Sequence, residues 1–500
     1  MRMRIEDLGE PNLEFGERVL SKDPKRGLAD AGPFASTYTP GTKQISLGLV
    51  ALPSEVDAVR RWVERMHRLL LDDESNALRF CEFPGLEKAF RCHLHIPDNF
   101  IRRLDERQYE FIASRPPHQR FEELIKFYGS AIKSLFTDQH PECILVCFPE
   151  EVASLRISNP KLSEKERLAL ERLQQEEEAE QLSLFEPTDD EKKLAAELLP
   201  QADELLFRNF HRALKAECMM EPNTVPIQVI RRHTYVSLEA KQSDATRAWN
   251  LALALYYKAG NIPWRPHDLP TGTCFIGISF HHLKRQSGDL VYASVAQAFS
   301  AAVEPFALKG QSIPRDQSRN KRPYLTESQS ANLIHRIISQ YKDRTGSLPS
   351  RVIVHKTSRY QPEEQAGFRQ GLLKEVAACE LVWMTPTGFR LLRRGMQPPA
   401  RGTLFTIENQ HNYLFTTGFV NRWDEYPGPH IPAPLQIGVC ESDNIAERAN
   451  EILSLTKMNW NSAEGIGRHP ITLSFARRVG TIMTEMDEDV TPNPLYRFYM

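Results

Sequence analysis

The sequence has 500 residues, of which 41 % are apolar and 26 % are charged, and its formal net charge is −2. This composition is ordinary for a globular chain of two to four domains, and it excludes a strongly basic surface overall. Any nucleic-acid binding would therefore rest on local clusters of cations. No segment approaches the ~18 apolar residues needed to span a bilayer, and the first residues form no apolar leader. We therefore expect a cytoplasmic protein that contacts no membrane.

Eight cysteines are scattered along the chain, several of them within apolar runs, where cysteine acts as a small hydrophobic residue. Disulfides are not expected. One group has residue types that bind metals, namely Cys81 together with Cys92, His93 and His95. It lacks a CxxC partner and regular zinc-site spacing. Simple alternation along a strand explains the group equally well, so metal binding is left open.

The first part of the chain predicts an α/β unit. Residues 1–50, including Asp23–Leu28, suggest turns and short strands because Gly and Pro interrupt the apolar pieces. The spacing of apolar residues predicts helices over Val56–Leu71 and Phe121–Phe136, and an apolar run predicts a strand over Cys143–Pro149. A helix that leads into such a strand is typical of a layered α/β fold. The layering is Rossmann-like, without the GxGxxG fingerprint.

A charged segment then interrupts this pattern. Residues 160–200 are rich in Glu, Lys and Gln, which predicts a solvated insertion. The α/β pattern resumes and continues to about Trp264, and the Pro- and Gly-containing stretch Arg265–Gly272 predicts a domain boundary. We therefore expect one unit over residues 1–265 and a second over 266–500.

Four polar side chains stand out between the insertion and this boundary. His211 and Lys215 are four residues apart in a predicted helix over 205–214, so they share one helix face. Gln228 interrupts the β-branched strand predicted for 225–230. Lys258 ends the helical run that precedes Gly260. Each has an ordinary explanation, such as solvation of the glutamine or pairing of the lysine with the helix dipole. If they converged, they would suit a terminal phosphate.

The second half predicts a three-stranded meander followed by alternating helices and strands, which is the layout of an RNase H-like fold. The predicted strands are Cys274–Phe280, Leu290–Phe299, Val303–Leu308, Arg351–Thr357 and Glu380–Met384, and the predicted helices are Leu325–Tyr341 and Pro362–Ala378.

The order and spacing of His211, Lys215, Gln228 and Lys258 resemble the guide 5′-phosphate pocket of the MID domain in Argonaute proteins. Further segments resemble the PIWI domain of that family in the same order: Ile276–Ser279, Val352–Thr357, Leu455–Asn461 and Pro470–Ala476. The resemblance covers roughly residues 205 to 500. It implies a Rossmann-like MID domain followed by an RNase H-like PIWI domain.

The resemblance also implies that this chain does not cleave nucleic acid. Slicing Argonautes hold two divalent cations with a carboxylate tetrad. Ser279 stands where the first aspartate is expected, Thr357 or its neighbour Ser358 where the second is expected, and Arg477 where the last is expected. We therefore expect no enzyme activity from this chain.

Two other functions are alternatives to this interpretation. One is an active nuclease that uses displaced acids such as Glu304, Asp316 or Glu363, although two-metal chemistry tolerates little displacement of ligands. The other is an α/β protein whose pocket binds a free phosphate metabolite.

The chain has no room for the N-terminal and PAZ domains of long Argonautes, so it resembles the short prokaryotic members. Those proteins pair with a second polypeptide that carries an APAZ region and an effector of the TIR, sirtuin or nuclease type. The resemblance implies a guide RNA, a single-stranded DNA target and a heterodimer in antiviral defence, often through depletion of NAD.

Two further site predictions come from the resemblance. Lys457 and Asn459 would contact the guide backbone, although a lysine at a helix C-terminus also pairs with the dipole. The carboxylate of Met500, with Gln228, would hold Mg²⁺ against the guide phosphate. The alternative is that the aromatic C-terminal residues only pack against the PIWI domain.

Overall fold

The computed structural model describes residues 2–39, 41–72, 76–158, 164, 207–220, 224–236, 242–284, 290–300, 303–313, 318–319, 322–372, 376–391, 395, 398–408, 411–428, 431–440, 444–487, 490 and 493–500. Within 281–304 and 309–323 only the main chain is described. Apart from residue 164, the predicted charged insertion over 160–200 lies outside the described residues.

The smaller of two main sheets has five parallel strands in the order β10-β7-β4-β5, with β6 also pairing with β4. The strands are β4 (Lys43–Ala51), β5 (Cys92–His95), β6 (Ile101–Arg103), β7 (Cys143–Cys147) and β10 (Ile227–Ile230). A parallel sheet must be covered on both faces. Its strands therefore read as near-continuous apolar runs, as Cys143–Cys147 does.

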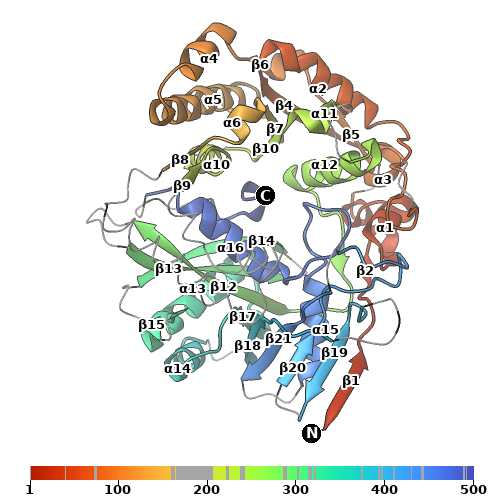
Figure 1. The fold of residues 1–500 in the computed structure, drawn as a ribbon, viewed down its shortest axis with the longest axis vertical. Helices are drawn as coiled ribbons and strands as arrows, with labels where there is room; N and C mark the ends of the chain where they lie inside the picture. The colour runs from red at the N-terminus through yellow and green to blue at the C-terminus, as the bar shows by residue number, and fades with distance from the viewer. Residues whose placement is uncertain are drawn as a thin grey trace.

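Helices cover both faces of this sheet, as Figure 1 shows. On one face, α2 (Pro53–Arg65), α3 (Leu86–Phe90) and α12 (Asp244–Lys258) pack in a common core, and on the other α5 (Pro117–Gln139) and α10 (Phe210–Met220) pack together. In β7, Leu145 faces the first core, whereas Ile144 and Val146 face the second. This alternation is the period of two expected for a strand. The predicted Rossmann-like layering is confirmed.

Three local predictions differ from the structure. Asp23–Leu28 is not a turn: Asp23 caps α1 (Pro24–Ala31) by accepting from the amides of Lys25 and Arg26, with Pro24 in the first turn. The helix expected to reach Leu71 ends at Arg65. Leu71 is exposed and does not pack in the core, so it does not extend the apolar face of the helix. The helix expected from residue 205 begins only at Phe210, because β9 (Phe207–Asn209) pairs with β8 (Arg156–Ser158).

The larger sheet has nine strands in the order β1-β19-β20-β21-β18-β17-β12-β13-β14. The predicted meander is present and antiparallel, and β17 and β18 then join β12 in parallel. The strands are β1 (Met3–Asp7), β12 (Thr273–Lys284), β13 (Leu290–Ser300), β14 (Val303–Ile313), β17 (Arg351–Lys356), β18 (Ala378–Pro386), β19 (Thr403–Ile407), β20 (His411–Leu414) and β21 (Leu435–Cys440).

Helices cover this sheet on both faces as well (Figure 1). Two pack in one core, α13 (Glu327–Thr345) and α14 (Pro362–Gln370), and two in the other, α15 (Ile445–Leu455) and α16 (Ile471–Met483). The predicted RNase H-like unit is confirmed. One strand departs from the expected boundary at residue 265. β1 was expected in the first unit, over residues 1–265, but it pairs with β19 at the edge of the larger sheet.

Smaller elements complete the described fold. They are β2 (Leu13–Glu14), β3 (Leu20–Ser21) and β11 (Arg265–Pro266), which form one small sheet; β15 (Ser318–Arg319) and β16 (Arg322–Pro323); α4 (Glu106–Ala113), α6 (Glu150–Ala153) and α11 (Arg232–Tyr235); and the 3₁₀ turns η1 (Gly16–Arg18), η2 (Phe34–Thr37), η3 (Asp98–Phe100) and η5 (Tyr496–Phe498). Within this described part, no helix is both long and apolar enough to cross a bilayer.

Candidate anion-binding site

Helix α10 positions His211 and Lys215. The side chain of Asn209 accepts from the amides of His211 and Arg212 at 3.0 and 3.3 Å, which satisfies two donors at the start of the helix. Phe210 and Leu214 pack in the core shared with α5, and this fixes the direction of the helix. His211 and Lys215 follow on a neighbouring face, one turn apart.

The predicted cluster comes together around the last residue of the sequence. The Nζ atom of Lys258, at the end of α12, donates to the main-chain oxygens of Ile227 at 2.7 Å and Met500 at 3.0 Å, and to Oε1 of Gln228 at 2.7 Å. Lys215 Nζ donates to the same oxygen of Met500. Residues from two helices, one strand and the C-terminal segment therefore meet at one point.

Both lysines are buried, and their described hydrogen-bond acceptors are the main-chain oxygens of Ile227 and Met500 and the amide oxygen of Gln228. Among these acceptors only the expected Met500 carboxylate carries a negative charge. Burial lowers the pKa of Lys258 to about 8. Burial, and then the charges of Lys258 and Arg478, hold the pKa of Lys215 well below its ordinary value. Such cations are held at a cost, and an anion that entered the site would offset it.

His211 lies beside these lysines. Its Nε2 atom is buried and has no hydrogen-bond partner among the described residues. Burial, followed by the charges of Lys215 and Lys258, holds the pKa of this imidazole well below its ordinary value. The histidine is therefore neutral at pH 7 and can offer one donor to a ligand.

The C-terminal segment reaches this cluster by packing against the larger sheet. The amide of Ala307 donates to the oxygen of Pro494 at 2.7 Å, and Leu495 forms a bridge with Phe306 in β14. Beyond it, Phe498, Tyr499 and Met500 are buried. The two alternatives weighed for this segment are thus not exclusive, because the aromatic side chains pack while Met500 meets the lysines.

Arg478 is a further cation near the site that the sequence did not single out. It lies on α16, which packs against α10, and its charge acts on His211, Lys215 and Lys258. One feature of the sequence could have identified Arg478: it directly follows Arg477, next to the segment that resembles the PIWI C-terminus. Its proximity to Lys215, more than 200 residues earlier, depends on the packing of the two units.

The positions expected to lack catalytic carboxylates lie on adjoining elements. Ser279 in β12 and Thr357 after β17 both follow the paired residues Ile278 and Lys356. Helix α16, which carries Arg477, packs so closely on β12 that a Cβ at Gly277 would lie 2.2 Å from the oxygen of Thr472. The three positions therefore come from neighbouring parts of the fold.

Of the displaced acids weighed for catalysis, Glu363 lies in the first turn of α14. Asp316 lies outside the described residues, and the side chain of Glu304 is not described.

The prediction that Lys457 contacts a guide backbone is wrong. Lys457 is fully buried, and its Nζ donates to the oxygens of Pro11 and Lys22 at 2.8 and 2.7 Å and pairs with Glu10 at 2.9 Å. The ammonium group is thus enclosed by the N-terminal segment. Lys457 follows α15 but is held by the N-terminal segment and not only by the helix dipole. Asn459 is half-buried, and its contact with a guide stays a prediction.

The group of Cys81, Cys92, His93 and His95 is divided by the strand period. In β5, Cys92 and Leu94 are buried while His93 and His95 point to the opposite face. Burial raises the pKa of Cys92 to about 12, so this thiol stays protonated. Among the described residues, no group of three or more metal-binding side chains is present. Strand alternation therefore accounts for the pattern.

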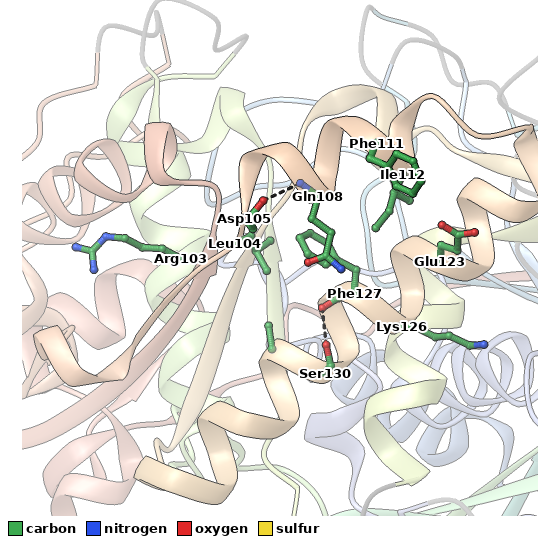
Figure 2. Close-up of a pocket in the computed structure, with 11 residues that line it drawn as sticks. Arg103, Leu104, Asp105, Gln108, Phe111, Ile112, Glu123, Lys126, Phe127 and Ser130 are labelled. Atoms are coloured by element: carbon green, nitrogen blue, oxygen red, sulfur yellow. Dashed lines mark hydrogen bonds between the residues drawn. The ribbon is translucent and has the colours of Figure 1, made fainter.

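A separate open cavity of about 650 Å³ lies between α4 and α5 (Figure 2). Asp105 caps α4 by accepting from the amide of Gln108 at 2.7 Å. The cavity is lined by both charge signs and contains no predicted site residue; its lining is Arg103, Leu104, Asp105, Gln108, Phe111, Ile112, Glu123, Lys126, Phe127, Ser130 and Ala131. It is thus distinct from the cationic cluster.

Comparison with solved structures places this site within a known fold. The Clostridium butyricum Argonaute bound to a guide DNA and a 19-mer target DNA is similar over 99 % of this chain and 55 % of its own, with a TM-score of 0.63 and 15 % identity. The chain has the MID–PIWI fold of Argonaute proteins. The A. aeolicus Argonaute is similar over 98 % of this chain and 54 % of its own, with a TM-score of 0.54 and 14 % identity.

A structure of Aa-Ago with externally bound siRNA gives the same picture, with a TM-score of 0.54, 13 % identity, and coverage of 99 % of this chain and 56 % of that one. This chain therefore spans about half the length of the Argonautes it matches. No protein-family model and no curated protein match the sequence. The MID–PIWI fold is thus present in a sequence that shares only 13 to 15 % identity with these structures.

Proposed function

We propose that this chain is the guide-binding sensor subunit of a short prokaryotic Argonaute system, and that the cluster of Lys215, Gln228, Lys258 and Met500 binds the 5′-phosphate of a guide RNA. The observation that carries the proposal is the convergence of two buried ammonium groups on one oxygen of Met500, so that the expected Met500 carboxylate supplies a single negative charge for two cations. A terminal phosphate supplies both the negative charge and the acceptor oxygens. The Argonaute fold, whose C. butyricum representative is bound to guide and target DNA, supports a guided mode of binding.

In this proposal each residue of the cluster has a separate role at the phosphate. Lys215 and Lys258 donate to phosphate oxygens, and the neutral imidazole of His211 donates to the phosphate or stacks on the first base. The oxygens of Gln228 and Met500 are hard ligands of the kind that Mg²⁺ takes, and both accept hydrogen bonds from Lys258 Nζ. To hold the ion they would have to release this ammonium group, which would then be available to the phosphate. Mg²⁺ would neutralise charge between the phosphate and these oxygens.

We propose further that pairing of the guide with single-stranded DNA does not lead to cleavage by this chain. Ser279, Thr357 and Arg477 supply no anionic oxygens for a two-metal site. The reaction would instead belong to a partner that carries an APAZ region and a TIR, sirtuin or nuclease effector, bound as a heterodimer. Duplex formation would then provide the free energy that activates the partner.

The first test is the nucleic acid that accompanies the chain. Purified from cells with its partner, the chain should carry short RNA with 5′-phosphate ends. The loaded chain should leave a complementary DNA strand intact in Mg²⁺ or Mn²⁺. Sequencing of the bound RNA and a gel assay of the DNA measure the two outcomes. Long RNA, no RNA, or cleavage that a nearby acid-to-amide variant abolishes would each contradict the proposal.

A pH titration provides a second prediction. A phosphate monoester becomes dianionic above about pH 6. The pKa of Lys258 is lowered to about 8, so this lysine is charged below that pH and loses its proton above it. Affinity for a 5′-phosphorylated guide should therefore be highest between about pH 6 and 8 and fall as the pH rises further. Fluorescence anisotropy with a 5′-hydroxyl guide is the control, and a parallel fall for both guides would contradict this account.

A further inference from the structure

Strand β1 forms an outer edge of the nine-stranded sheet, next to β19 (Figure 1). Among the described residues it pairs only with β19, in antiparallel register from Met3 opposite Ile407 to Asp7 opposite Thr403. An edge strand offers main-chain donors and acceptors to any further strand, and proteins usually protect such an edge. The side chains of β1 alternate between exposed apolar residues, Met3 and Ile5 at 56 % and 64 %, and the charged residues Arg4 and Glu6. Charges on an edge strand restrict pairing to a partner strand whose charges match.

The hydrogen bonds to β19 show which residues of β1 face outward. Leu8 donates its amide to Gly402, and Arg2 accepts from the amide of Glu408, so the even-numbered residues bond to β19. In an antiparallel pair the alternate residues point their main-chain groups the other way. The N–H and C=O groups of Met3, Ile5 and Asp7 therefore face the free edge.

The side chains of β1 are complementary to a second copy of the same strand. If two copies pair antiparallel about Ile5, Ile5 lies opposite Ile5 and the outward groups of Met3 meet those of Asp7. Arg4 then lies opposite Glu6 of the other copy, twice over. These are non-hydrogen-bonded pairs, in which side chains approach most closely. Within one chain Arg4 and Glu6 already pair at 2.8 Å on the same face. The register that satisfies every outward main-chain group thus also matches the charges.

We propose that the chain forms a twofold symmetric dimer in which β1 pairs antiparallel with β1 of a second copy, centred on Ile5, so that the two large sheets become continuous. Such an interface is isologous and closes on itself. It lies at the edge of the larger sheet and uses none of the residues of the anion-binding cluster, so it goes beyond the proposed function and does not depend on it.

A charge-swap series tests the pairing. Arg4→Glu or Glu6→Arg alone places like charges opposite each other and should weaken the dimer about 10-fold. The double variant R4E/E6R restores opposite charges and should dimerise as the parent does. An equimolar mixture of the two single variants should also form heterodimers, because one chain then carries two acids and the other two arginines. Sedimentation velocity at low salt, from about 5 to about 200 µM protein, measures these species.

A crosslink locates the dyad. In the proposed pairing, the Cα atoms of the two Ile5 residues lie about 5.5 Å apart, within the range that a disulfide spans. Ile5→Cys should therefore form a covalent dimer on mild oxidation, whereas Leu20→Cys, at an exposed position of β3, should not. A chain that stays monomeric over the whole range overturns the proposal. If the single variants dimerise like the parent, or if mixing them produces no additional dimer, any dimer must form through another surface. Either result would also overturn the proposal.

Discussion

The double substitution Lys215→Ala with Lys258→Ala is expected to weaken binding of a 5′-phosphorylated guide by at least about 100-fold, while binding of a 5′-hydroxyl guide changes little. Each lysine would lose a charge-assisted hydrogen bond to phosphate, worth about 1.5 to 3 kcal/mol. Two such losses correspond to about two to four orders of magnitude in affinity. Both ammonium groups already point at one oxygen of Met500, so a single phosphate can receive both.

Filter binding with matched guides measures this discrimination directly. The control variant is Lys88→Ala with Lys126→Ala, which removes the same charge from exposed positions of α3 and α5. It should reduce the affinity for both guides by a similar small factor, because it only weakens the general field. Equal losses for both guides in the Lys215 and Lys258 variant would mean that these lysines do not recognise the terminal phosphate.

The second large effect is expected at a buried ion pair next to Thr357. Lys356, at the end of β17, donates to both carboxylate oxygens of Glu364 at 2.5 and 2.6 Å, and both side chains are fully buried. Glu364 also accepts from the amides of Leu325 and Gln361 at 3.0 and 2.8 Å. One carboxylate thus joins β17 to the starts of α13 and α14.

Glu364→Ala should lower the free energy of unfolding by about 3 to 5 kcal/mol, because it leaves the Lys356 charge buried without its partner. Urea denaturation followed by circular dichroism measures the change. Glu327→Ala, at an exposed acid in the first turn of α13, is the control and should cost less than about 1 kcal/mol. The double variant Lys356→Met with Glu364→Leu should recover much of the loss, since it removes both charges. A double variant no more stable than Glu364→Ala would contradict the ion-pair explanation.

The fold was largely predictable from local patterns, and the site only in part. Apolar runs located β7 and β10 of the smaller sheet and β12, β13, β14, β17 and β18 of the larger one, because buried strands must be apolar. Strands β19, β20 and β21 were not predicted. The helical spacing of His211 and Lys215 was visible in the sequence, but only the resemblance brought Gln228 and Lys258 to them. The structure brings these four residues together.

What failed depended on contacts distant in sequence. Lys457 lies within a segment that resembles a guide-binding motif, yet its ammonium group is held by Glu10, more than 400 residues earlier. No local pattern reveals such a pair. The misread helix α1 is different, since Asp23 followed by Pro24 is a recognisable helix start that Gly27 obscured. Arg478 was missed because charge alone does not indicate which cation faces a site.

The pairing of β1 with β19 has a consequence for how the protein is made. Ile5 lies opposite Phe405, so 400 residues separate partners within one ladder. At about 5 to 20 residues per second, the ribosome needs about 20 to 80 s to supply β19 after β1 has emerged. During that interval the strand has not yet paired with β19, and its Met3 and Ile5 are open to other chains. The larger sheet can therefore be completed at this edge only late in synthesis, and slower translation would prolong the exposure of β1.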